Sequence, residues 1–253
     1  MKNSAIKKAG AVLVLVLGAS SVWATAYQDR DEINKSFTLP AKARVEVSAF
    51  SGSVDITAVD GDTAIVQIER TGRSRAELDC NNVVLDHAWG NLSIQSKNVG
   101  GPGCQIQVVH RVRLSLPRYV DLSVNGVSGP INIGEIDGTL RISGNTGIIN
   151  VSQSGRGSRI TGNSGTTAIK LRRLDAGALE LTGNSGLLKL YVNEELNIYV
   201  KVSGHSGSVS SELPNVKFIK TGEADYFARI GSGGPTINVD GNSGSVLLSR
   251  YRE

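Results

Sequence analysis

The sequence predicts an all-β protein, a single-stranded β-solenoid (β-helix-like) with rungs of about 18–21 residues. A Ser-Gly or Thr-Gly pair recurs along the chain, with marker glycines at Gly52, Gly129, Gly147, Gly165, Gly186, Gly207 and Gly244. The longer gaps between them fit this period if weaker copies stand at Gly90 and near residue 225. Alternating strands flank the markers, and alternation of period two buries one face of a strand. Because no convincing helical periodicity follows the first 26 residues, stacked strands are expected to build the fold.

Residues 1–26 are predicted to be a signal peptide. Three lysines (Lys2, Lys7 and Lys8) precede the apolar run from Ala9 to Leu17, and Ala24-Thr25-Ala26 provides small residues for cleavage before Tyr27. An uncleaved membrane anchor is the alternative, but the run is shorter than the roughly 20 residues that a bilayer requires. We therefore expect an exported protein with no transmembrane segment in its mature chain. A periplasmic location is the simplest expectation, and the cell surface and secretion are the alternatives.

The mature chain is expected to be nearly neutral. The full sequence has 27 Lys and Arg against 23 Asp and Glu, but three of the lysines belong to the leader. Nucleic-acid binding would require a basic surface that neutralises phosphates. The balance of charge therefore gives no support to a nucleic-acid partner.

Residues 27–253 are predicted to form one β-solenoid domain. Its amino-terminal half, to about residue 117, is less regular than the rungs over 118–250, and no Pro- or Ser-rich linker separates the two parts. Cys80 and Cys104 fall in the irregular half. In an oxidising compartment two cysteines are most simply explained as one disulfide, although two buried free thiols are the alternative.

A five-residue corner of repeated composition joins the two strands of a regular rung, as in Thr161-Gly162-Asn163-Ser164-Gly165. Glycine permits the positive φ angles of such a corner, and asparagine tolerates the left-handed region. Stacking of the rungs should place the central side chains above one another, where amides can hydrogen-bond as a ladder. The predicted ladder consists of Asn145, Asn163, Asn184, His205 and Asn242. His205 occupies an asparagine position, so a structural role is favoured over a catalytic one.

A column of outward side chains is the candidate contact surface. The residues six positions before the markers include Arg141, Arg159 and Lys201, together with Glu180 and Asn238. Neighbouring rungs are about 4.8 Å apart, so Arg141 and Arg159 should stand side by side. The candidate strip consists of Arg141, Arg159 and Lys201, with Arg118 and Lys170 as possible extensions. The hypothesis is that this strip contacts an anionic envelope polymer. The alternative is an ordinary solvated charged face, on which exposed ion pairs contribute little.

The run from Leu116 to Val151 resembles the bacterial putative-adhesin β-strand-repeat family, a domain of unknown function. The resemblance rests on Leu116-Pro117-Arg118, Val127-Ser128-Gly129, Asp137-Gly138 and Asn145-Thr146-Gly147. It also includes the ending Ile230–Pro235 with Ile237-Asn238-Val239 and Asn242-Ser243-Gly244, which looks like the family's closing rung. The resemblance covers roughly residues 35–250. It implies a β-solenoid in the cell envelope or outside the cell, with no assigned enzymatic activity, cofactor or binding residue.

The leading functional expectation is an exported, non-enzymatic envelope protein, an adhesin-like scaffold or binding module. Its partner would be an envelope polysaccharide, another envelope protein or a second copy of the chain. The alternative is a β-helical polysaccharide lyase or hydrolase, but a hydrolase needs two carboxylates held close together. The acidic residues of the rungs are scattered over turns and outward positions: Glu135, Asp137, Asp175, Glu180, Glu194 and Glu195. The sequence therefore predicts no catalytic, cofactor-binding or metal-binding residues.

Overall fold

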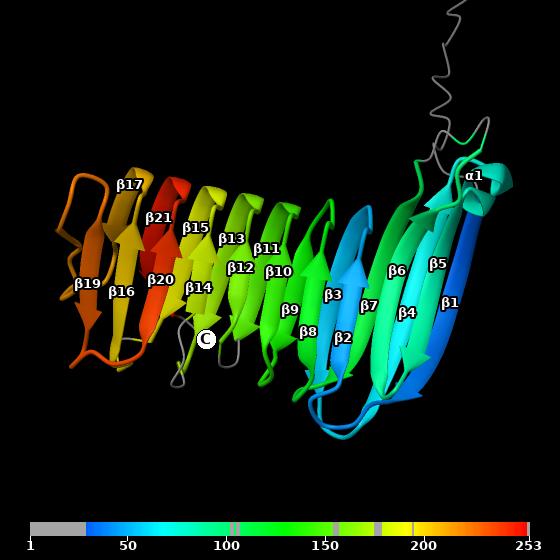
Figure 1. The fold of residues 1–253 in the computed structure, drawn as a ribbon, viewed down its shortest axis with the longest axis horizontal. Helices are drawn as coiled ribbons and strands as arrows, with labels where there is room; N and C mark the ends of the chain where they lie inside the picture. Colours follow the sequence, from blue (N-terminus) through cyan, green and yellow to red (C-terminus); the bar gives the residue numbers. More distant parts are fainter. Residues whose placement is uncertain are drawn as a thin grey trace, which may run out of the picture.

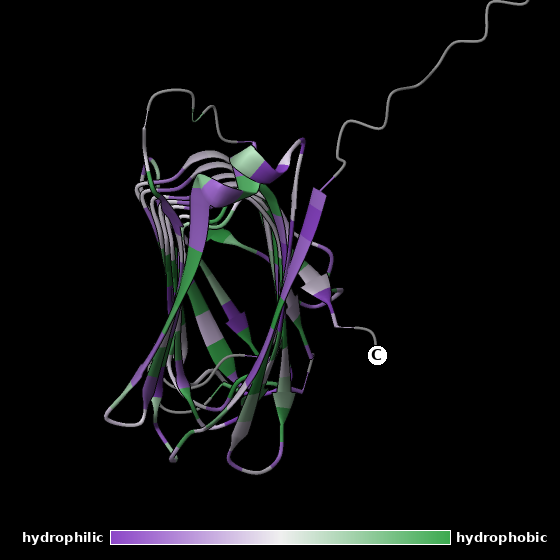
Figure 2. Cartoon of the chain, turned by 90° about the vertical axis from the view of Figure 1, so that its right-hand side faces the viewer, coloured by the Kyte–Doolittle hydropathy of each residue, from purple (hydrophilic) through white to green (hydrophobic). Residues whose placement is uncertain are grey.

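The alternating segments form two long sheets that face each other. The computed structural model describes residues 29–101, 104, 107–153, 157–174, 179–193 and 195–251. Figure 1 shows the strands stacked along the long axis, and Figure 2, a view along that axis, shows the two layers. The protein is thus all-β, with two long and mostly parallel sheets. The predicted signal peptide lies outside the described residues.

Within the described residues, sheet 1 has ten strands and sheet 2 has eleven. In spatial order, sheet 1 contains β1 (Asp29–Thr38), β4 (Thr63–Gly72), β7 (Val109–Pro117), β3 (Gly52–Val59), β9 (Ile131–Glu135), β11 (Thr146–Gln153), β13 (Ser164–Leu171), β15 (Ser185–Val192), β21 (Ser243–Arg250) and β17 (Ser206–Ser211). Sheet 2 contains β18 (Ile219–Lys220), β19 (Tyr226–Ile230), β16 (Ile198–Ser203), β20 (Thr236–Asp240), β14 (Leu179–Thr182), β12 (Arg159–Thr161), β10 (Leu140–Ser143), β8 (Asp121–Asn125), β2 (Arg44–Ser48), β6 (Asn91–Asn98) and β5 (Asn81–Ala88).

A rung is one strand of sheet 2, the corner after it, and the next strand of sheet 1. Thr146 pairs with Ser164 and Ser164 with Ser185, in parallel register. Equivalent corner asparagines are 18 residues apart at the first of these steps and 21 at the second. The inward side chains of both sheets fill one continuous apolar core, in which Leu181, Leu190 and Val239 are fully buried. Because a single rung cannot cover its own apolar face, stacking is what buries these residues.

The rungs do not stack in chain order. The rung of β20 and β21 lies between the rung of β14 and β15 and the rung of β16 and β17. The ending of the chain, which looks like the family's closing rung in the sequence, therefore does not lie at the end of the stack. β20 and β21 form an interior rung, although they are the last strands of the chain.

Two weaker repeat copies were also assigned wrongly. Leu92, after Gly90, pairs with Val45 of β2, so β6 is a strand that enters a corner and not one that leaves it. The segment near residue 225 forms β19, which pairs antiparallel with β16, with Ala228 opposite Val200. Both segments alternate like the regular strands, which is why the pattern alone misplaced them.

Antiparallel strands close both ends of the stack. β1 and β4 extend sheet 1 beyond β7, β5 extends sheet 2 beyond β6, and β19 and β18 extend sheet 2 at the other end. One short helix, α1 (Arg75–Asp79), joins β4 to β5 and was not predicted. Its amino-terminal cap is Ser74, whose hydroxyl accepts the backbone N–H of Glu77 at 3.4 Å.

Candidate functional site

The predicted asparagine column forms a hydrogen-bonded ladder in the buried corner. The Nδ2 of Asn145 donates to Oδ1 of Asn163 at 3.0 Å, and the Nδ2 of Asn163 donates to Oδ1 of Asn184 at 2.9 Å. The same oxygens accept backbone N–H groups, and Oδ1 of Asn242 accepts the backbone N–H of Asn184 at 2.6 Å. These amides satisfy backbone groups that the corner removes from the sheet ladders. The asparagines therefore have a structural role, which is to join the corners of adjacent rungs.

His205 occupies the ladder position beside Asn242 at the end of the column. The residue is 5 % exposed, and neither ring nitrogen has a hydrogen-bond partner among the described residues. The backbone N–H of His205 donates to the carbonyl of Ala224 at 3.0 Å. The imidazole thus fills the corner without continuing the ladder.

The outward strip has a different order from the one the sequence indicated. Arg141 pairs with Arg159 across β10 and β12, so these two side chains are neighbours. Arg159 also forms an ion pair with Glu180, its neighbour on the other side. Asn238 of the interior rung separates Glu180 from Lys201. The column therefore consists of a pair of arginines, one of them partly neutralised, with Lys201 further along the face.

The two proposed extensions of the strip lie on other parts of the molecule. Arg118 follows β7, and its Nε donates to Asp60 at 2.8 Å. The ion pair with Asp60 is the main cause that raises the pKa of Arg118. Lys170 belongs to β13 in sheet 1, where it pairs with Tyr191. Neither residue continues the column of Arg141 on sheet 2.

Cys80 and Cys104 are joined by a disulfide, with 5.7 Å between their Cα atoms. Cys80 is the carboxyl-terminal cap of α1, and its carbonyl accepts the backbone N–H of Val99 at 2.9 Å. The bond therefore ties the segment before β7 to the short helix at the closed end of the stack. Its loop is 24 residues long, which in the loop-entropy description stabilises the fold by about 3 kcal/mol.

A buried polar cluster next to the disulfide was not predicted. His110 is 2 % exposed; its Nδ1 lies 3.1 Å from the carbonyl oxygen of Ser51, and its Nε2 lies 2.9 Å from Oδ1 of Asn81. The Nδ2 of Asn81 donates to Ser96 at 2.9 Å, and Arg70 donates to the carbonyl of Asn81. The alternation of Val108, His110 and Val112 already marks His110 as inward. Its partners could not be found in this way, because they come from distant strands.

Burial lowers the pKa of His110 to about 4, and the positive charge of Arg70 contributes in the same direction. The hydrogen bond to Ser51 acts against this shift. The imidazole is therefore neutral at pH 7. Arg70 forms an ion pair with Asp31, and this hydrogen bond is the largest cause that lowers the pKa of the Asp31 carboxyl.

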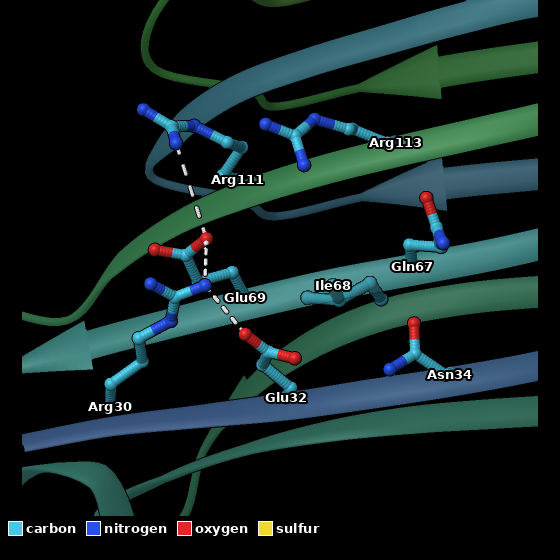
Figure 3. Close-up of a pocket in the computed structure, with 8 residues that line it drawn as sticks. All are labelled: Arg30, Glu32, Asn34, Gln67, Ile68, Glu69, Arg111 and Arg113. Carbon is cyan, nitrogen blue, oxygen red and sulfur yellow. Dashed lines mark hydrogen bonds and ion pairs between the residues drawn. The ribbon is translucent and has the colours of Figure 1, made fainter.

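A small charged pocket of about 100 Å³ lies over β1, β4 and β7 (Figure 3). Figure 3 shows Glu69 between Arg30 and Arg111, at ion-pair distances of 3.0 Å and 4.0 Å. Arg30 also pairs with Glu32. These four charged side chains pair with one another, and Arg113, which also lines the pocket, forms no ion pair within the described residues.

Within the residues that the structure describes, no group of three or more His, Cys, Asp and Glu side chains is placed to hold a metal ion. In the same part of the chain, no helix is long and apolar enough to cross a membrane. Of the scattered acidic residues, Asp175 and Glu194 lie outside the described residues. Glu135 pairs with Arg172 and Asp137 with Arg173, so these two carboxylates are engaged in surface ion pairs.

Several solved structures are similar to this chain. One is a protein described as a putative cell adhesion protein from Clostridium sporogenes ATCC 15579, with 12% identity, a TM-score of 0.47, and coverage of 88% of this chain and 100% of that one. A putative adhesin from Bacteroides fragilis NCTC 9343 has 10% identity, a TM-score of 0.29, and coverage of 87% and 97%. A putative lipid binding protein from Parabacteroides distasonis ATCC 8503 has 12% identity, a TM-score of 0.30, and coverage of 88% and 97%. At these values the likenesses carry no functional argument.

No curated protein matches the sequence significantly. The sequence profile of the family described as Toastrack DUF4097, by contrast, matches residues 26–249. This match spans both sheets, both closed ends and all of the corners described above. The chain therefore belongs to the toastrack family DUF4097.

Proposed function

We propose that this protein is an exported, non-enzymatic β-solenoid of the cell envelope, and that it acts as an adhesin-like scaffold or binding module. The periplasm is the proposed location, on the strength of the leader in residues 1–26. The disulfide supports an oxidising compartment, because such bonds persist there.

One observation carries the proposal: parallel, in-register stacking turns each repeat position into a straight column of outward side chains. On sheet 2, Arg141, Arg159 and Glu180 follow one another on adjacent strands. A column with a spacing of about 4.8 Å offers an extended partner contacts at regular intervals. Such a surface suits a polymer or a second elongated protein better than a small substrate. The proposed partner is an anionic envelope polysaccharide.

The first test locates the protein and its partner. Fractionation of the native host, followed by photo-crosslinking from position 141, should place the mature chain in the envelope fraction with a covalently attached polymer. Amino-terminal sequencing should begin near Tyr27. Recovery of an uncleaved chain in the cytoplasmic fraction would overturn the proposal.

The second test concerns the arginine pair itself. Arg141→Gln combined with Arg159→Gln should weaken retention on anionic envelope polysaccharide at low salt, and added salt should weaken the wild-type contact because exposed charges are screened. Glutamine avoids placing a second acid beside Glu180. Lys35→Gln with Lys97→Gln is the matched control, since these exposed lysines lie on β1 and β6, outside the arginine pair on β10 and β12. Equal retention of both double variants across the salt series would leave the pair as ordinary surface.

A further inference from the structure

We propose that an open groove at the end of sheet 2 formed by β18, β19 and β16 is the principal sugar-binding site, and that it takes an acidic sugar residue of the uronic acid class. This inference rests on the proposed function, because it assigns a specific site and ligand chemistry to the polysaccharide contact. The groove lies on β16, β18 and β19 and on the segment before β18. Its lining residues are Tyr199, Pro214, Asn215, Lys217, Ile219, Phe227 and Arg229.

Apolar and aromatic side chains form the floor of this groove, whose volume is about 890 Å³. The rings of Tyr199 and Phe227 lie 5.4 Å apart, with 33° between their planes. Both are partly exposed, and Ile219 beside Phe227 is 63 % exposed. Aromatic side chains are few in this chain, at 5% of its residues, so a paired platform on the outer surface is unusual here. Exposed rings of this kind offer flat faces to a ligand.

The charge of the groove is positive and unbalanced. Lys217 and Arg229 are exposed on its wall, and neither forms an ion pair within the described part of the chain. Among the residues that the structure describes, no carboxylate lines the groove. Arg229 lies opposite Tyr199 in the antiparallel pairing of β16 and β19, and both residues line the groove. A guanidinium binds a carboxylate through two parallel hydrogen bonds, which makes a ring that bears a carboxylate the complementary ligand.

The groove also continues the outward column of sheet 2. Lys201 lies beside Asn238 in that column, Phe227 lies opposite Lys201, and Ile219 lies opposite Phe227. A chain seated on the platform can therefore run along the face toward the arginine pair. Because the groove is open to solvent, it would leave much of an acyl chain in water, whereas a sugar ring needs only one apolar face covered. The arrangement favours an acidic sugar over a lipid tail.

Calorimetric titration with oligogalacturonate tests the proposal, and the methyl ester of the same oligosaccharide separates charge from ring stacking. The acid should bind at least tenfold more tightly than the ester. Lys217→Gln with Arg229→Gln should lower the affinity for the acid at least tenfold, to a value close to the affinity for the ester. Phe227→Leu keeps an apolar side chain but removes the ring face, so it should lower the affinity for both the acid and the ester. Thermal unfolding of each variant checks that the fold is intact.

The control pair Lys35→Gln and Lys97→Gln removes the same charge elsewhere and should leave affinity within twofold of the wild type. Equal binding of acid and ester, no binding of the acid at millimolar concentration, or equal affinity of the groove and control variants would overturn the proposal. Binding to phosphatidylglycerol vesicles that depends on Lys217 and Arg229, without oligogalacturonate binding, would assign the groove to a lipid surface instead. Arg141 and Arg159 do not line the groove, so the result for the arginine pair separates failure of this site from failure of the proposed function.

Discussion

The side chain of Asn163 donates to Oδ1 of Asn184 at 2.9 Å, and the same oxygen accepts the backbone N–H of Asn163 at 3.1 Å. One amide oxygen thus joins two rungs through both side chain and backbone. Asn184 in turn donates to the carbonyl of Ile160 at 3.3 Å. The side chain of Asn184 therefore both accepts from and donates to the preceding rung, whereas an ionised aspartate at this position could only accept.

Asn163→Asp is expected to lower the free energy of unfolding by about 1–3 kcal/mol at pH 7. The new carboxylate oxygen would face Oδ1 of Asn184 where a donor is needed. Urea unfolding measures the loss. Lowering the pH should reduce it, because a protonated acid can donate again. The control is Asn150→Asp, an exposed amide that donates to Asn132 on the outer face of β11 and β9. An equal effect of both variants would show that the corner amides do not act as a buried ladder.

His205→Asn is expected to stabilise the protein by about 1 kcal/mol, or roughly 2–4 °C in Tm. The backbone N–H of Asn242 has no acceptor among the described residues, whereas the equivalent N–H of Asn184 is bonded to Oδ1 of Asn242. An asparagine at position 205 would supply the missing oxygen and remove two unpartnered ring nitrogens. His205→Ala removes the nitrogens without adding an acceptor and should not reproduce the gain. A Tm for His205→Asn at or below that of the wild type would contradict the prediction.

The stability of the protein is expected to fall as the pH decreases from about 6.5 to 4. The unfolded chain binds the His110 proton near pH 6.5, but the folded chain binds it only near 4, so the unfolded state holds more protons in this window. A shift of this size corresponds to about 3 kcal/mol. Urea unfolding at pH 7, 5.5 and 4 measures the loss.

His110→Gln should flatten this part of the pH profile, because glutamine does not titrate. Asp31 affects stability in a lower pH range than His110. The pKa of its carboxyl lies below the ordinary value of 3.8, so its contribution to the free energy of unfolding is lost only as the pH falls below about that value. A wild-type profile that stays level between pH 6.5 and 4 would show that His110 is not buried as a neutral ring. NMR titration of the His110 ring provides an independent measure.

The corners and the register of the regular rungs could be predicted from the sequence, because most of these rungs have an asparagine and a marker glycine at a fixed spacing. Asn145, Asn163 and Asn184 stand at the same distance before a marker glycine, and the structure stacks them directly. The order of the rungs could not be predicted in this way. Every rung has the same alternation, so nothing local distinguishes Thr236–Asp240 as a neighbour of Leu179–Thr182 from a strand at the end of the stack.

The closed ends were missed for a related reason. His110 stands opposite Gly52, where other rungs have a glycine, so the repeat is hidden at that point. Its partner Asn81 comes from β5, an antiparallel strand of the other sheet. Contacts of this kind arise from how the ends fold back over the core and have no fixed spacing in the sequence. The candidate groove is likewise built by the antiparallel strands β18 and β19, which the repeat pattern assigned to a rung.

The two glycines of a corner should tolerate substitution very differently. Gly165→Ala is expected to destabilise the protein by roughly 3 kcal/mol or more, because a Cβ there would overlap the carbonyl oxygen of Gly147 on the adjacent rung, and φ is +105°. Gly162 also has a positive φ, of +62°, but a Cβ there meets no atom within 4 Å. Gly162→Ala should therefore cost only about 1 kcal/mol, the strain of the left-handed conformation. Thermal unfolding of the two variants separates close backbone packing from backbone strain, and equal losses would show that the approach of neighbouring rungs does not require the marker glycine.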